Sequence, residues 1–271
     1  MQHVFALAAF IASHAAQSEW SLHAVRYATV QNFPVAGLVA GADTSRRMDI
    51  AMMVWLLRSD ARVVLVDAGF HRDRFLERWK PADYVRPSAA LAAIGVRPED
   101  VTDVILTHVH WDHADGVDLF PNARVWIQAE EYRHYVGPNG EPIDEPQITP
   151  EVAATLASLD RAGRLGLVDG SDREILPGIT VYTGGKHTFA SQYVGVRTAS
   201  GRAVIASDNL YLYENLDRRV AIAQTLDVSS NLRAQERMLQ LASDRRLIVP
   251  GHDPAVFERF PLVAPGVARI R

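Results

Sequence analysis

The stretch ILTHVHWDHADG, residues 105–116, places three histidines and two aspartates directly after an apolar run. Such a motif occupies the loop at the end of a buried strand, where a rigid scaffold can present side chains. His108 and His110 are two positions apart, so in an extended segment both side chains point to the same side. Asp112 continues this alternation, whereas His113 has the opposite phase and requires the chain to turn into a helix. The two directions predict two neighbouring metal ions rather than one.

Two metal ions need more than four ligands, and three further candidates lie beside an apolar strand or a glycine turn. They are His187 in TGGKHTFASQ, Asp208 in VIASDNLY and His252 in IVPGHDP. The complete set of five histidines and two aspartates suits zinc and, less exclusively, iron, manganese or cobalt. The remaining histidines are interpreted as structural or surface residues: His3, His14, His23, His71 and His134.

The composition excludes several classes of site. The 271 residues include no cysteine, which rules out disulfides, thiolate catalysis and cysteine-ligated zinc. The net charge of -4 provides no basic face for nucleic acid or an anionic membrane surface. A small apolar or weakly polar ligand is therefore the expected partner.

The hydrophobic pattern alternates between strands and helices, which indicates an α/β protein whose sheets are covered by helices. Strands are predicted at residues 52–57, 63–66, 104–106, 125–127, 179–182, 193–196, 203–206 and 247–249, and helices at 72–80, 88–94, 129–135, 150–162 and 231–242. Residues 136–150 concentrate glycine and proline, so we expect a long surface loop there, of a length that often carries function.

The N-terminal segment, residues 1–20, combines an apolar run at 4–12 with small residues near Ala15. This weakly resembles an export signal, but no Lys or Arg precedes the run, which is also too short to span a bilayer. We therefore expect an N-terminal arm on a cytoplasmic protein, with an exported protein as the alternative. Because no linker divides the rest, residues 21–271 are expected to form a single domain.

The sequence HVHWDH, followed by a distant His, Asp and His, resembles the metallo-β-lactamase superfamily, and VLVDAGF at residues 64–70 is similar to its early Asp-x-Gly motif. The resemblance spans residues 52–252 and implies a four-layer αββα sandwich with two metal ions at one edge, between the sheets. It implies that the first metal is held by His108, His110 and His187, and the second by Asp112, His113 and His252. It further implies that Asp208 bridges the two metals and that Asp67 orients the ligand loop from behind.

Local features favour the N-acyl-homoserine lactonase branch. Zinc β-lactamases of the common type carry Cys at the place of Asp208, flavo-diiron proteins generally carry Glu at the place of His110, and nucleases would show a basic surface. The lactonases resemble this chain in a Tyr three positions after the bridging Asp, here Tyr211, and an aromatic residue inside the histidine motif, here Trp111. The lactonase pattern usually has Gly-Gly where this chain has Asp115 and Gly116, and Gly-His-Thr where it has Lys186, His187 and Thr188. The pattern explains neither Asp115 nor Lys186.

The resemblance thus implies a dinuclear metal-dependent hydrolase that opens N-acyl-homoserine lactones, a quorum-quenching activity, by attack of a metal-bridging hydroxide. Tyr211 would donate a hydrogen bond to the carbonyl, and Asp112 or a metal-bound water would protonate the ring oxygen. The alternatives are hydrolysis of a thioester, phosphodiester, sulfate ester or β-lactam, and an iron-binding oxygen sensor or redox module. A homodimer is implied by the resemblance only.

Six residues are candidates to line an apolar channel for an acyl chain. For every one except Trp111, packing in the core is the stronger interpretation. The candidates are Trp20, Phe33, Met48, Trp111, Phe189 and Tyr213.

Overall fold

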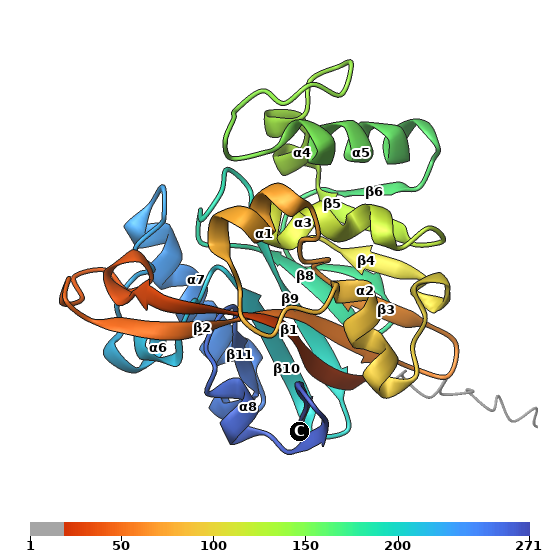
Figure 1. The fold of residues 1–271 in the computed structure, drawn as a ribbon. Coiled ribbons are helices and arrows are strands. Elements are labelled where there is room, and N and C mark those ends of the chain that lie inside the picture. The colour runs from red at the N-terminus through yellow and green to blue at the C-terminus, as the bar shows by residue number, and fades with distance from the viewer. Residues whose placement is uncertain (1–18) are drawn as a thin grey trace, which may run out of the picture.

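The structure, a computed structural model, describes residues 19–271. Two β-sheets lie face to face with helices on their outer sides (Figure 1), which confirms the four-layer αββα sandwich. The first sheet has the order β12-β13-β1-β2-β3-β4-β5-β6 and the second β11-β10-β9-β8-β7. Within the first sheet, β3, β4, β5 and β6 run parallel to one another.

The strands of the first sheet are β1 (Ser21–Pro34), β2 (Arg47–Arg58), β3 (Val63–Val66), β4 (Asp103–Ile105), β5 (Arg124–Gln128), β6 (Leu165–Val168), β12 (Leu262–Ala264) and β13 (Val267–Ile270). The strands of the second are β7 (Arg173–Leu176), β8 (Ile179–Thr183), β9 (Gln192–Thr198), β10 (Gly201–Ser207) and β11 (Ile248–Pro250). The helices are α1 (Asp73–Trp79), α2 (Pro87–Ala90), α3 (Trp111–Ala114), α4 (Ala129–Tyr135), α5 (Pro150–Arg161), α6 (Tyr213–Arg218), α7 (Val228–Leu241) and α8 (Val256–Arg259).

Three hydrophobic cores separate the four layers, and the period of two along each strand divides the side chains between them. In β2, Trp55 packs toward the second sheet, whereas its neighbour Val54 packs against the outer helices. In β10, Ile205 packs between the sheets and Val204 packs against α7. Both sheets are therefore apolar on both faces, which is why the sequences of their central strands are continuous apolar runs.

The helices on the first sheet include α4 and α5, which lie side by side next to β5 and β6 (Figure 1). Thr149 caps α5 by accepting a hydrogen bond from the backbone N–H of Val152, and Pro150 occupies the first turn, where its missing N–H costs nothing. Asp227 caps α7 in the same way through Ser230. Among residues 19–271, no helix combines the length and apolar composition that a membrane crossing requires.

Most of the arm predicted for residues 1–20 lies outside the described residues, together with His3 and His14. Trp20 is described, and it is not part of a detached arm. Its backbone N–H donates to the carbonyl of Arg197 and its indole Nε1 to that of Pro177, both at 2.9 Å. Trp20 thus belongs to the core between the sheets.

Candidate metal centre

All seven predicted ligands meet at one end of the sandwich because each follows the carboxyl end of a strand. His108, His110, Asp112 and His113 follow β4, and the last two lie on the short helix α3. The second sheet contributes the other three ligands, with His187 after β8, Asp208 after β10 and His252 after β11. These seven side chains form two groups that could each hold a metal ion and that share Asp208, with ligand atoms within 4.8 Å of one another.

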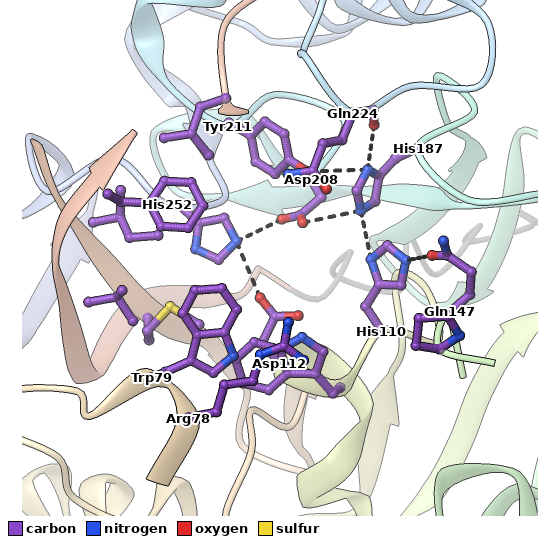
Figure 2. A pocket seen from close by; sticks show the side chains of 17 residues that line it. Arg78, Trp79, His110, Asp112, Gln147, His187, Asp208, Tyr211, Gln224 and His252 are labelled. Carbon is purple, nitrogen blue, oxygen red and sulfur yellow. Dashed lines mark hydrogen bonds and ion pairs between the residues drawn. The ribbon is translucent and has the colours of Figure 1, made fainter. Parts of the chain in front are cut away.

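The first group consists of three imidazoles and one carboxylate oxygen (Figure 2). The Nδ1 atom of His110 lies 3.0 Å from Nε2 of His108 and 2.9 Å from Nε2 of His187. The Oδ2 atom of Asp208 lies 3.3 Å from Nε2 of His187. Three ring nitrogens and one oxygen thus surround a common point, an arrangement that a tetrahedral or five-coordinate ion can occupy.

The second group uses the other oxygen of Asp208. Its Oδ1 lies 3.1 Å from Nε2 of His252 and 3.3 Å from Nε2 of His113. The Oδ2 atom of Asp112 faces the same two nitrogens, at 3.7 and 3.5 Å. Because its two oxygens face different groups, Asp208 can act as the bridging ligand.

Outer hydrogen bonds determine which nitrogen of each imidazole carries the proton. The nitrogen directed away from the centre contacts an acceptor in every case: Thr107 Oγ1 for His108, Gln147 Oε1 for His110, Asp67 Oδ2 for His113, the Gln224 carbonyl for His187 and the Ala51 carbonyl for His252. In the first group the inward nitrogens therefore carry lone pairs, which repel one another at about 3 Å unless a cation lies between them. His113 Nε2 and Asp208 Oδ1 are also buried without a hydrogen-bond partner. The residues therefore fit divalent metal ions.

Asp67 connects the strands behind the ligands. Its carboxylate accepts hydrogen bonds from the backbone N–H of Thr107 at 2.8 Å, from Ser207 Oγ at 2.9 Å and from His113 Nδ1 at 2.8 Å. Asp67 is buried and has a φ of 60°, a left-handed conformation that costs energy in a residue other than glycine. Such strain is tolerated where a side chain must be held in one place, as it is here.

Burial determines the charge of the first group, and the facing histidines determine the charge of the shared carboxylate. Burial lowers the pKa of His108 well below its usual value, and burial together with His110 lowers the pKa of His187 to about 4. The imidazoles of the first group are therefore neutral at pH 7. Burial would raise the pKa of Asp208, but the facing His113 and His252 hold it well below the usual value, so this carboxylate stays ionised.

A pocket of about 240 Å³ opens beside the ligands. Trp111 and Phe33 line it, and the ring of Trp111 stacks with those of Phe75 at 4.6 Å and Trp79 at 5.5 Å, measured between ring centres. The other four channel candidates lie outside its lining. Trp20 and Tyr213 belong to the core between the sheets, Met48 packs against the outer core, and Phe189 stacks on His134.

Several residues of the pocket wall were not indicated by the sequence, among them Arg78, Trp79, Gln147 and Gln224. Arg78 and Trp79 lie at the end of a helix that the sequence does predict, but its spacing does not show which face reaches the ligands. For Gln147, the only indication in the sequence was the length of the loop at 136–150, which suggested a functional role for the loop as a whole.

Asp115, which the sequence left unexplained, joins the ligand loop to the start of α1. Its carboxylate accepts from the backbone N–H of His71 at 2.9 Å and pairs with the Arg72 guanidinium at 2.5 Å. Gly116, in contrast, has to be glycine, because a Cβ atom there would overlap the carbonyl oxygen of Ala68. The departure from the Gly-Gly pattern thus supplies an additional contact without changing the position that requires glycine.

Lys186 occupies a left-handed position, with a φ of 56°, directly before His187. Glycine adopts this conformation without strain, which explains why the family pattern has Gly there. In this chain the Nζ of Lys186 donates to the carbonyl of Phe189 at 2.6 Å and lies 4.6 Å from the centre of its ring. These contacts offset part of the backbone strain.

Comparison with known proteins agrees with this geometry. Residues 53–252 match a family model described as the metallo-beta-lactamase superfamily. The chain belongs to this superfamily. Similar members of the superfamily include N-acyl homoserine lactonase AiiB of Agrobacterium fabrum, 28% identical over 237 residues that cover 79% of this chain and 83% of the relative. An N-acyl homoserine lactonase of Bacillus cereus is 25% identical over 224 residues, which cover 76% and 82%.

Solved structures of superfamily members share the fold. One is an N-acyl homoserine lactone hydrolase with the product N-hexanoyl-L-homoserine at its catalytic metal centre, with a TM-score of 0.74 and 17% identity over 91% of this chain and 98% of that chain. Another is AidC, a dizinc quorum-quenching lactonase, with a TM-score of 0.68 and 15% identity over 94% and 97%. At these identities the likeness shows that the fold is shared.

Proposed function

We propose that this protein is a dinuclear zinc lactonase that opens the ring of N-acyl homoserine lactones. Membership of the superfamily, together with relatives named lactonases, makes it a hydrolase that acts on ester bonds. The observation that carries the finer proposal is the pair of ligand groups sharing Asp208, next to an apolar pocket that Tyr211 also lines.

Each ligand has a proposed place at the centre. The first metal would be held by His108, His110 and His187. The second would be held by Asp112, His113 and His252, and Asp208 would contact both metals. Two bound divalent ions supply a Lewis acid for the lactone carbonyl and a water that is acidic at neutral pH. Asp67 keeps His113 in the required tautomer from behind.

Tyr211 would donate a hydrogen bond to the lactone carbonyl as negative charge develops on its oxygen. Its hydroxyl lies 3.3 Å from Nδ1 of His187, but that nitrogen donates its own proton to the Gln224 carbonyl at 2.8 Å. The Tyr211 proton is therefore free for a ligand. Burial and the charges of Asp208 and Asp112 raise the pKa of Tyr211 well above its usual value, so the hydroxyl stays protonated at neutral pH.

Asp112 would move the proton that ring opening requires. Its Oδ2 faces His113 and His252, which leaves Oδ1 toward the pocket that Asp112 lines. Burial would raise the pKa of Asp112, but His113 lowers it, so the carboxylate can accept a proton from the attacking water. Returned to the ring oxygen, that proton completes hydrolysis to a hydroxy acid.

The test is a substrate panel with zinc-loaded protein and an Asp208→Ala variant as the matched control. We expect rapid opening of N-acyl homoserine lactones, slow or no turnover of thioesters, phosphodiesters, sulfate esters and β-lactams, and loss of both zinc and activity in the variant. A protein that leaves every lactone intact, or that prefers another ester class, would refute the substrate assignment. Two metals retained by the Asp208→Ala variant would refute the bridging role.

A further inference from the structure

The segment between α4 and α5, residues 136–150, is fixed to the body of the protein on both sides of the pocket wall that it supplies. Within its first half, Val136 forms a β-bridge with Pro142, and the backbone N–H of Ile143 ties this half to α4 by donating to the Tyr135 carbonyl at 3.0 Å. Near its end, Ile148 is fully buried in the outer core. Gln147, directly before this anchor, therefore has a defined place in the pocket wall.

The amide oxygen of Gln147 fixes the tautomer of a ligand. His110 Nδ1 faces the ring nitrogens of His108 and His187, so its Nε2 must carry the proton. That N–H donates to Gln147 Oε1 at 2.6 Å, as Figure 2 shows. Because the oxygen accepts this hydrogen bond, the orientation of the carboxamide is determined. The NH2 group of Gln147 therefore does not contact His110.

Gln147 is exposed at the edge of the pocket that it lines, and its NH2 group donates to no other described residue. Gln224, the other carboxamide of the lining, already donates to the Gly37 carbonyl at 3.1 Å. Gln147 therefore offers a neutral donor at the exposed edge of a largely apolar pocket, on the same side chain that contacts His110. A neutral donor at this place suits a carbonyl oxygen of the bound molecule.

We propose that Gln147 is both a positioning residue for His110 and a specificity-determining residue of the pocket. Its oxygen keeps Nδ1 of His110 available to the metal, and its NH2 group donates to the amide carbonyl of the acyl arm. The second role rests on the proposed function, since it requires a lactone with an N-acyl group. The pocket would thereby distinguish N-acyl lactones from lactones that carry a plain alkyl arm.

Two substitutions separate the two roles. Gln147→Glu keeps an acceptor for His110 but loses the donor, so zinc affinity, measured by competition with a chelator, should stay within about threefold of the wild type. Its KM for an N-acyl homoserine lactone should rise about tenfold, the effect of one lost hydrogen bond, while the KM for an alkyl-substituted γ-lactone stays unchanged. Gln147→Leu loses both groups and should bind zinc about tenfold more weakly.

Ile143→Ala is the matched control, because this exposed residue of the same segment lies outside the pocket lining. It should change neither zinc affinity nor KM. Unchanged zinc affinity in Gln147→Leu would overturn the positioning role. An equal rise in KM for both lactones in Gln147→Glu, or no rise, would overturn the substrate contact.

Arg78, a charged donor of the lining, provides a further discrimination. If Arg78→Met, and not Gln147→Glu, raised KM selectively for the N-acyl lactone, the contact would belong to Arg78 and the proposal for Gln147 would be wrong. If the wild type opened no lactone at all, the proposed function and the substrate contact would both fail. The zinc affinities would then still decide the positioning role.

Discussion

At the scale of the residue, the centre depends on single side chains that never reach a ligand position. Glu131 on α4 is fully buried and accepts hydrogen bonds from the backbone N–H of Val109, at 3.3 Å, and from Thr188 Oγ1, at 2.6 Å. Val109 lies between two ligands of the first group and Thr188 follows the third. One carboxyl group thus fixes both ligand loops, and nothing in its local sequence reveals this contact.

Glu131→Gln should make stability less dependent on pH. Burial raises the pKa of Glu131 from 4.5 to about 7, although its hydrogen bonds partly oppose the shift. The folded state therefore favours the protonated form, and the contribution to stability is complete below about pH 4.5 and lost as pH rises through 7. Relative to the wild type, the variant should gain up to about 3 kcal/mol in unfolding free energy between pH 5 and 8. Denaturant unfolding at several pH values would measure this difference, and parallel curves would contradict it.

Tyr211→Phe should reduce turnover without loss of metal. The proposed hydrogen bond to the developing oxyanion disappears, and removal of one such donor lowers kcat by about 10²-fold. Tyr213→Phe is the control, since the hydroxyl of this buried residue has no hydrogen-bond partner and lies outside the pocket lining. Steady-state kinetics and metal analysis of both variants would check the expectation. Equal rates for Tyr211→Phe and wild type would remove Tyr211 from the mechanism.

At the scale of the element, the sequence predicts helices with capped or regular apolar spacing better than it predicts strands that are short or carry many polar residues. The predictions at 129–135 and 150–162 correspond closely to α4 and α5. Strand β1 was missed, because its polar residues obscure the pattern and its pairing with both β2 and β13 is a tertiary effect. Strands β6, β7, β12 and β13 were missed too; each has only three or four residues, with exposed positions.

Prediction of the site is limited in the same way, because some of its residues are placed only by tertiary contacts. The elements that end at ligands could be located because each ligand adjoins an apolar strand or a glycine turn. The pocket wall could not, because Trp79 and Gln147 reach it from a helix and a loop whose placement depends on long-range packing.

Asp115→Ala should loosen α1 against the ligand loop. The buried carboxylate pairs with Arg72, the residue that precedes α1, and removal of one partner of a buried pair costs about 3 kcal/mol. Because α1 also carries Trp79, the KM for the substrate should rise. Asp118→Ala is the control, since its more exposed carboxylate contacts the same guanidinium and should contribute less than about 1 kcal/mol. Equal unfolding free energies for the two variants would contradict the expectation.

At the scale of the whole molecule, the seven candidate ligands come from both sheets. Four of them come from loops of the first sheet and three from loops of the second, so bound metal would join the two layers at this end, in addition to the apolar and hydrogen-bonded contacts between them. Metal binding to such a site adds directly to the free energy of folding.

Removal of metal should therefore lower the melting temperature as well as activity. A site saturated about 1,000-fold above its dissociation constant contributes about 4 kcal/mol, which corresponds to a shift on the order of 10 °C for a chain of this size. Calorimetry with and without a chelator would measure the shift. Asp208→Ala serves as the control, because a variant that holds no metal should melt at the same temperature in both conditions.

Because every ligand follows the carboxyl end of a strand, the opposite end of the second sheet takes no part in the chemistry. The turn between β9 and β10 contains the exposed residues Ala199 and Ser200, and the seven residues of β10 separate it from Asp208 by about 20 Å. A tether or an immobilising tag inserted there would leave the mouth of the pocket open to solution. The pocket and the β9–β10 turn thus lie at opposite ends of the second sheet. The protein could therefore be attached to a surface through this turn.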